Sequence, residues 1–371
     1  MIRLPDNIRR TLARIVNQQK IKENVYGIGL FGSWSRGDAD SSSDVDLFIF
    51  DKSDFVWEYV ERIETGGLSI DFDHVPKKWM QGLLPPETDQ KLYEMQILYD
   101  RDWSLTNTKL LMIKSYSSLE RVGIRTEAHI VDSDIYLSRA TSAFSRGDFC
   151  SAYLFAVSAF ENALKILIEI ALEPLSNSHF VEKFEISASK LRLSDLYEKY
   201  LTMSGLAEAS DEQVKERLRL FNDVWSEAAA AVRQDMRVLE SLHFKVKTRL
   251  LYYLNSAFLQ GVVARINALM DSGRAAEASH YLNSIFIDML ENYVWFKSSV
   301  RKVKIDYSML IRCLERMEGK DSRNYRNIVG FLNLEDVDGV AAERVIEDVR
   351  EAILRIRRNR KILIKSVLSK S

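Results

Sequence analysis

A short polar stretch between two apolar runs constrains the fold of this chain more than any other feature. The runs at residues 25–31 and 45–50 each have the length and the apolar content of a buried β-strand. Between them, residues 32–44 are mainly small, polar and acidic. The glycine of the Gly32-Ser33 pair lets the backbone approach another group closely. The stretch therefore predicts two buried strands with a tight backbone turn directly after the first.

Two acidic residues, Asp44 and Asp46, stand at the start of the second predicted strand. Side chains two positions apart on a strand point to the same face of the sheet. Two neighbouring carboxylates repel each other, and a fold tolerates them mainly where a cation lies between them. With the open backbone at Gly32-Ser33, the acidic pair predicts a site for a nucleoside triphosphate bound with Mg²⁺ or Mn²⁺.

The spacing of these motifs resembles the signature of the polymerase-β-like nucleotidyltransferase superfamily. A Gly-Ser pair at 32–33 is followed by ten residues and then by Asp-Val-Asp at 44–46. The Arg-Gly pair at 36–37 is similar to the form found in minimal and kanamycin-type nucleotidyltransferases. The resemblance covers roughly the first hundred residues, which is the size of one small domain. A Ser- and Asp-rich surface loop between two strands is the alternative interpretation.

The resemblance implies a reaction and a set of ligands. An acceptor hydroxyl would attack the α-phosphorus of a nucleoside triphosphate, with ATP as the expected nucleotide, and pyrophosphate would leave. Two metal ions would be held by Asp44, Asp46 and a third carboxylate. Gly32 and Ser33 would bind the phosphates through backbone N–H groups and the serine hydroxyl.

The third carboxylate is implied to come from the strand expected at residues 70–75. This strand carries Asp71 and Asp73 on one face. Asp71 lies between two hydrophobic residues, the triplet that the family shows here, so we expect Asp71 to be the metal ligand. Asp73 is the alternative ligand, or a base for the acceptor. Both acids are expected to be exposed and to face a metal-binding cleft.

Two further candidate site residues have a structural explanation that competes with the functional one. Arg36 is expected to pair either with the triphosphate or with a neighbouring acid in a structural salt bridge. Glu161 is a candidate base for the acceptor by analogy with the helical domains that accompany related enzymes. An ordinary polar helix position is the alternative for Glu161.

Residues 1–104 are expected to form an α/β sheet domain, because helical and strand patterns alternate there. We expect a helix over 6–20, a strand over 68–75 and a short strand over 96–99. A serine that could serve as an N-cap begins residues 53–64, for which we expect a further helix.

The rest of the chain is expected to be all-helical, in one domain over 105–250 and a second over 251–371. Apolar residues recur at helical spacing over 152–172 and form a wide stripe. This helix and the one before it resemble the opening of HEPN-type and kanamycin-nucleotidyltransferase-type helical domains. These two helices form a predicted hairpin with Gly147 in its turn. A second predicted hairpin has apolar residues at the same spacing, with Gly273 in the position of Gly147. Internal duplication and unrelated helices both remain open.

Composition limits the partners and the location. The chain of 371 residues has a formal net charge of −1, so contact with RNA would have to be local. The five histidines and the two cysteines, Cys150 and Cys313, give neither a metal-site spacing nor a disulfide framework. We find no apolar run long enough to cross a membrane and no signal peptide, and expect a cytoplasmic protein. Homo-oligomerisation through the helical region stays open.

Three functions compete. The leading expectation is an enzyme that transfers a nucleoside monophosphate to a hydroxyl of a small molecule, a protein or RNA. The second is an antitoxin-like module that binds and masks a partner. The third is an HEPN-type ribonuclease, because Arg237 and His243 fit the loose arginine–histidine pattern of that class.

Overall fold

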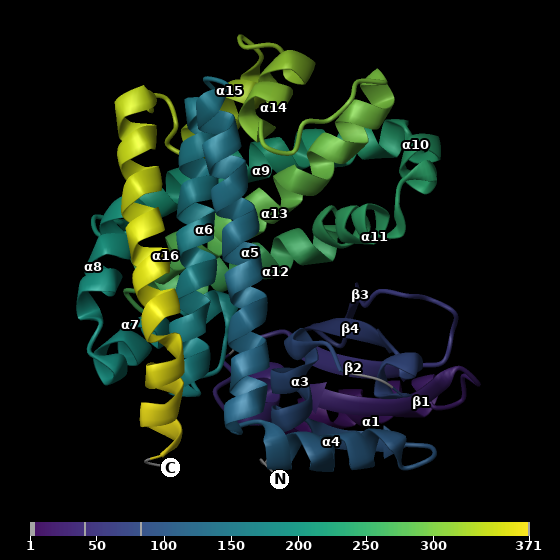
Figure 1. Cartoon of the computed structure of the whole chain (residues 1–371). Helices are drawn as coiled ribbons and strands as arrows, with labels where there is room; N and C mark the ends of the chain where they lie inside the picture. The colour runs from purple at the N-terminus through teal and green to yellow at the C-terminus, as the bar shows by residue number, and fades with distance from the viewer. Residues whose placement is uncertain (1–3, 41, 82–83, 370–371) are drawn as a thin grey trace. The chain divides into compact units, whose positions relative to one another are not determined.

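The computed structural model describes residues 4–40, 42–81 and 84–369 (Figure 1). By its internal contacts the chain divides into two compact units. The first unit consists of Met1–Ser118 and His243–Ala268, and the second of Leu119–Leu242 and Leu269–Ser371. Within the described residues all β-strands belong to the first unit and end by Asp100. The expected combination of an N-terminal sheet domain with a large helical region is confirmed.

The first unit is built on a five-stranded mixed sheet with the order β3-β4-β2-β1-β5. The strands are β1 (Val25–Phe31), β2 (Val45–Asp51), β3 (Tyr59–Thr65), β4 (Leu68–Pro76) and β5 (Gln96–Asp100). β2 and β4 are parallel, while the other neighbours are antiparallel. Helix α1 (Asp6–Gln19) contributes Ile8, Leu12 and Ile15 to a buried cluster with apolar residues of the sheet. The predicted strands and the first helix are therefore confirmed.

The helix expected over residues 53–64 is wrong, because Tyr59–Thr65 is the edge strand β3. β3 and β4 form a hairpin in which Thr65 pairs with Leu68. Gly66 and Gly67 make its two-residue loop, with φ of +61° and +74°. Two positive φ angles in succession are typical of the tight hairpin turns that favour glycine. The glycine pair was therefore a hairpin signal, and the charged residues of the edge strand concealed the alternation.

Short helices and one distant segment complete the first unit. The helices are α2 (Gly32–Arg36), α3 (Asp89–Glu94) and α4 (Ser104–Ser115), with 3₁₀ turns at Lys77–Gln81 and Pro86–Thr88. Much later in the chain, α11 (Phe244–Tyr253) packs near β3, and α12 (Ser256–Asp271) belongs to this unit as far as Ala268. The sheet domain is thus completed by residues far beyond its own sequence.

The second unit is a helical assembly in which α5, α6 and α16 run side by side (Figure 1). Its helices are α5 (Leu119–Ser145), α6 (Phe149–Ala171), α7 (Phe180–Leu191), α8 (Ser194–Met203), α9 (Asp211–Gln234), α10 (Met236–Ser241), α13 (Ala275–Arg301), α14 (Leu310–Glu318), α15 (Arg323–Phe331) and α16 (Gly339–Leu368). The apolar stripe of α6 is buried, and Asp148 caps that helix by accepting a hydrogen bond from Ser151 N–H. None of the helices in the described residues is long and apolar enough to cross a membrane.

The three-domain division expected from the sequence stays a prediction, and the compact units group the residues differently. α4 and residues 243–268 belong with the sheet rather than with the helical region. The two hairpin turns compared above both have a glycine with positive φ, +71° at Gly147 and +69° at Gly273. Similar turns are expected both from an internal duplication and from unrelated helices, so the duplication also stays a prediction.

Candidate active site

The turn after β1 is shaped by a glycine that packs against a carboxylate. Gly32 begins α2 with φ +71°, and a Cβ added there would lie 2.2 Å from Oδ2 of Asp46. Its N–H donates to Oε1 of Glu94 at 2.8 Å. The carbonyl oxygen of Ser33 accepts from Gly37 N–H at 2.8 Å and closes the short helix. Only glycine satisfies both the backbone angle and the close approach at position 32.

Sheet pairing brings three acids together. Asp46 on β2 is in register with Phe31, the last residue of β1, and with Asp71 on β4. Asp44 immediately precedes β2. Burial raises the pKa of Asp46 well above its usual value, and the charges of Asp44 and Asp71 raise it further. The three carboxylates predicted as metal ligands therefore form one electrostatically coupled group.

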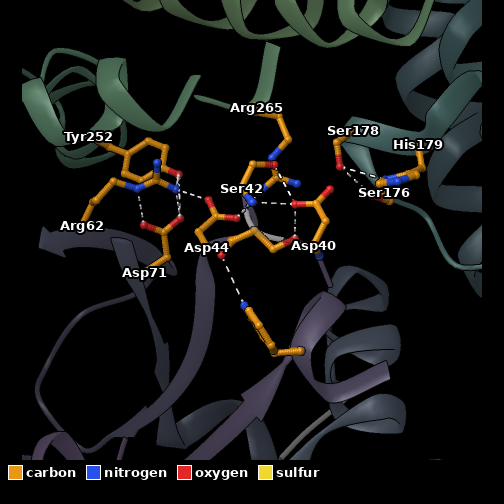
Figure 2. A network of polar contacts seen from close by, with 12 residues as sticks. Asp40, Ser42, Asp44, Arg62, Asp71, Ser176, Ser178, His179, Tyr252 and Arg265 are labelled. Atoms are coloured by element: carbon orange, nitrogen blue, oxygen red, sulfur yellow. Dashed lines mark hydrogen bonds and ion pairs between the residues drawn. The ribbon is translucent and has the colours of Figure 1, made fainter. Parts of the chain in front are cut away.

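Two arginines hold two of these acids (Figure 2). Arg62 on β3 donates from Nε to Oδ1 and from Nη2 to Oδ2 of Asp71, each at 2.6 Å. Nη2 of Arg62 also contacts Asp44, whose other oxygen accepts from Nη2 of Arg265 on α12 at 2.7 Å. Burial alone would lower the pKa of Arg62, but its hydrogen bonds to Asp71 and the attraction of that carboxylate raise it. The guanidinium is therefore a permanent cation at the site.

The distant segment α11–α12 encloses Arg62. The hydroxyl of Tyr252 donates to Oδ2 of Asp71 at 2.9 Å, and the ring of Tyr252 lies 5.5 Å from Cζ of Arg62. Asn255 Nδ2 donates to the carbonyl oxygen of Arg62 at 3.3 Å. At Gly261 an added Cβ would lie 2.7 Å from Nη1 of Arg62, so a larger side chain would push the guanidinium away. This segment completes the polar network around the acids.

Sequence reasoning did not identify Arg62, Tyr252 and Arg265 as site residues. A local signal existed only for Arg62, which lies opposite Asp71 in the hairpin register. Finding it required recognising β3 as a strand. Tyr252 and Arg265 lie in helices far along the chain, and nothing in their own sequence surroundings marks them.

Asp73 has a different environment from Asp71. It lies opposite Phe48 in the sheet register and forms an ion pair with Lys91, which also binds Glu58 at 3.1 Å. Burial raises the pKa of Asp73 despite the attraction of Lys91. Asp73 is 3% exposed and Asp71 is 7% exposed, so the expectation that both acids face an open cleft is wrong. The structure groups Asp71, rather than Asp73, with the other two acids.

Arg36 forms a structural salt bridge. Its Nη1 lies 2.9 Å from Oε1 of Glu94, and its Nε lies 3.1 Å from Oδ2 of Asp38. Glu94 accepts from both Arg36 and Gly32, and thereby ties α2 to α3. A contact between Arg36 and a triphosphate stays a prediction.

Glu161, the candidate base, lies on α6 inside the helical unit. Its carboxylate is 3.1 Å from Nζ of Lys165 and 3.5 Å from Nε2 of His280. Burial would raise the pKa of Glu161, but the attraction of Lys165 and the contact with His280 outweigh burial and lower it. A lowered pKa weakens a carboxylate as a base. Its role toward an acceptor stays a prediction.

The residues of the ribonuclease pattern fall in different units, Arg237 on α10 and His243 before α11. Nδ1 of His243 accepts from Lys245 N–H at 3.3 Å and so caps α11. Arg237 is exposed. A role for these residues in RNA cleavage stays a prediction.

The carboxylates fit a divalent metal in their chemistry. Mg²⁺ and Mn²⁺ prefer oxygen ligands, which Asp44, Asp46 and Asp71 supply. In the part of the chain that the structure describes, no group of three or more His, Cys, Asp or Glu side chains is arranged to hold a metal. Asp44 and Asp71 are instead held by the two arginines. A metal ion would therefore have to replace at least one arginine contact.

Comparison with known proteins agrees with the geometry of the first unit. Residues 9–94 match the family model described as "Nucleotidyltransferase domain". The chain therefore carries a nucleotidyltransferase domain, and the class of protein indicated is a nucleotidyltransferase enzyme. Domains of this family use nucleoside triphosphates and divalent metals. The match confirms the resemblance for the N-terminal part of the chain and leaves the HEPN-like resemblance of the helical region a prediction.

Among solved structures, the chain is similar to a nucleotidyltransferase-like protein from Exiguobacterium sibiricum, with 13% sequence identity. The alignment covers 83% of this chain and 91% of that chain, with a TM-score of 0.33. None of the curated proteins matches the chain at a significant level.

Proposed function

We propose that the protein transfers a nucleoside monophosphate from a metal-bound nucleoside triphosphate to a hydroxyl group of an acceptor. The observation that carries this proposal is the convergence of Asp44, Asp46 and Asp71 beside Gly32. Three neighbouring acids in a partly buried site are costly to a fold, and costs of this kind concentrate at functional sites. A module that only masks a partner has no need of them.

The three carboxylates would hold the divalent metal, which would stabilise the negative charge that develops on the phosphates during transfer. Arg62 and Arg265 neutralise the same acids when no substrate is bound. Once released from a carboxylate, either guanidinium is suited to phosphate oxygens, because its planar donors match them geometrically. Gly32 and Ser33 would place the triphosphate beside the acids.

The acceptor is proposed to be a hydroxyl of a small molecule, a protein or RNA, with ATP as the donor. The net charge of −1 favours no polyanion, so RNA would need a local basic surface. Asp73 is the candidate base of this proposal, because Glu161 has a lowered pKa and its carboxylate lies against Lys165 and His280. A cytoplasmic location and association through the helical region belong to the same proposal.

Calorimetry with ATP, GTP, CTP and UTP, each with and without Mg²⁺ or Mn²⁺, tests the proposal. We expect saturable binding of at least one nucleotide only when the metal is present, because the acids repel phosphate without it. The Asp46→Asn variant is the matched control, and its nucleotide binding should no longer depend on the metal. Heats that are absent, or equal with and without metal, would contradict the proposal and favour the masking module.

A further inference from the structure

The second unit contains a cavity that the proposed reaction does not use. It has a volume of about 110 Å³ and lies among α6, α8, α9, α13 and the loop at 332–334. One water needs about 10–15 Å³ of such volume, so the space corresponds to roughly seven to eleven waters. A small organic molecule fits it. We call this cavity the helical-unit pocket.

One wall of the helical-unit pocket is a buried arginine. Arg217 on α9 donates from Nε to the carbonyl oxygen of Phe331 at 3.1 Å and from Nη2 to Oδ1 of Asn283. Both partners are neutral. In the described residues no carboxylate pairs with Arg217, and burial lowers its pKa to about 10. A buried cation without a counter-ion is costly, and an anion in the pocket would remove that cost.

The lining of the helical-unit pocket also includes a buried histidine whose ring nitrogens have no hydrogen-bond partner among the described residues. His280 on α13 is 3% exposed, and its ring stacks on Phe180 with a centroid distance of 4.4 Å. Nε2 of His280 lies 3.5 Å from Oε2 of Glu161, which also lines the pocket. Buried polar atoms of this kind usually have a partner, and a bound molecule would provide it.

The charges around the helical-unit pocket leave one positive charge uncompensated. Glu161 is paired with Lys165 on the same helix at 3.1 Å. Arg217 then remains as the single extra cation among these three residues. A monoanion balances the pocket, whereas a dianion would leave it negative. A carboxylate therefore suits Arg217 better than a phosphate group does.

We infer that the helical-unit pocket binds a small hydroxycarboxylate. Its carboxylate would accept from Arg217, and its hydroxyl group would donate to Glu161 or His280. The apolar lining, which includes Leu154, Val157 and Ile287, would surround the short carbon chain. The site is formed by the second unit alone and is separate from the nucleotidyl-transfer proposal.

The full chain should be titrated calorimetrically and by thermal unfolding with L-lactate as the probe. A ligand that binds only the folded state raises the melting temperature as its concentration rises. Three compounds serve as controls. Acetate lacks the hydroxyl group that would donate, and methyl lactate lacks the negative charge. Inorganic phosphate tests whether the pocket prefers a carboxylate to a phosphate group. All are compared at constant ionic strength, at concentrations up to about 10 mM, which reaches millimolar Kd values. We expect saturable binding of lactate and at least about tenfold weaker binding of the three controls.

Two variants test the assignment. Arg217→Met should abolish binding, but Arg217 also binds the carbonyl at the end of α15, so this variant tests folding as well. Ser158→Val separates the two effects. Among the residues that the structure describes, Oγ of Ser158 bonds only the carbonyl of Leu154 on its own helix, and the added methyl fills pocket space. Ser158→Val should fold, keep metal-dependent nucleotide binding and bind lactate at least about tenfold more weakly.

Any of three results would overturn the inference. The first is that lactate does not bind saturably. The second is that acetate, methyl lactate or phosphate binds as tightly as lactate does. The third is that Ser158→Val binds lactate as tightly as the parent chain does. Nucleotide binding is measured in the same samples, so failure of the helical-unit pocket and failure of the proposed function are distinguishable.

Discussion

Asp46 is a half-buried acid at the candidate active site, beside two other carboxylates. Burial and like charge both raise its pKa, so its ionised form destabilises the fold. Arg62 offsets this repulsion by holding Asp44 and Asp71. At the scale of single residues, the repulsion among the three acids is therefore offset by contacts with arginines, which a metal would replace.

The choice between Asp71 and Asp73 is the first prediction at this scale. Asp71→Asn should lower nucleotidyl transfer at least about a hundredfold, or ~2.7 kcal/mol, because it removes a proposed metal ligand. Asp73→Asn should keep weakened activity, because Asp73 is paired with Lys91 instead. Steady-state kinetics on both variants gives the comparison, and circular dichroism verifies that each is folded. Near-normal turnover of Asp71→Asn with an inactive, folded Asp73→Asn would require the two roles to be exchanged.

Arg265 gives a second prediction, in which two affinities change in opposite directions. Removing a cation from Asp44 should favour another cation there, so Arg265→Met should bind Mn²⁺ about tenfold more tightly, or ~1.4 kcal/mol. The same variant should bind the triphosphate more weakly. Electron paramagnetic resonance of free Mn²⁺ measures the first effect and calorimetry the second. Arg249→Met, which removes an exposed arginine of α11, is the control for net charge. Equal Mn²⁺ affinity of both variants would show that Arg265 does not compete with the metal.

At the scale of helices and strands, a glycine in a hairpin turn and a glycine inside a helix differ in the backbone angle that each position requires. Gly66 in the β3–β4 hairpin has φ +61°, whereas Gly123 lies inside α5 with open space around its missing Cβ. The same substitution should therefore have opposite effects at the two positions.

Gly66→Ala should lower the free energy of unfolding by about 1 kcal/mol or more, since alanine is strained at positive φ. Gly123→Ala should raise it by about 0.5–1 kcal/mol, because alanine favours a helix interior. Chemical denaturation of both variants measures the two effects. Stabilisation by Gly66→Ala would contradict the hairpin geometry.

Elements with a local pattern could be predicted from the sequence. α1, β1, β2, β4 and α6 each have an apolar period or run that identifies them without their neighbours. β3 could not be predicted in this way. It is an edge strand with charged residues, and its pairing with β4 decides its conformation. Asp44 and Asp46 could be proposed because their spacing along a strand gives their direction, and Asp71 because its hydrophobic neighbours match the triplet of the family. Tyr252 and Arg265 come to lie at the site only when the chain folds, and no local sequence pattern indicates this.

At the scale of the whole molecule, the chain passes between its two units at residues 118–119, 242–243 and 268–269. The unit that carries the candidate active site therefore depends on a segment encoded within the helical region. A fragment ending at residue 118 would lack Tyr252 and Arg265. Tests of the reaction consequently need the full chain.

Transfer of a labelled nucleotide by the full chain tests the central claim most directly. The protein is incubated with each α-labelled nucleoside triphosphate, Mg²⁺ or Mn²⁺, and fractions of a cell extract, beside an Asp44→Asn, Asp46→Asn double variant. The account predicts that a fraction gains label only with the parent chain and metal, and that pyrophosphate is released in equal amount. Label that appears equally with the double variant, or no label in any fraction with any of the four nucleotides, would contradict it.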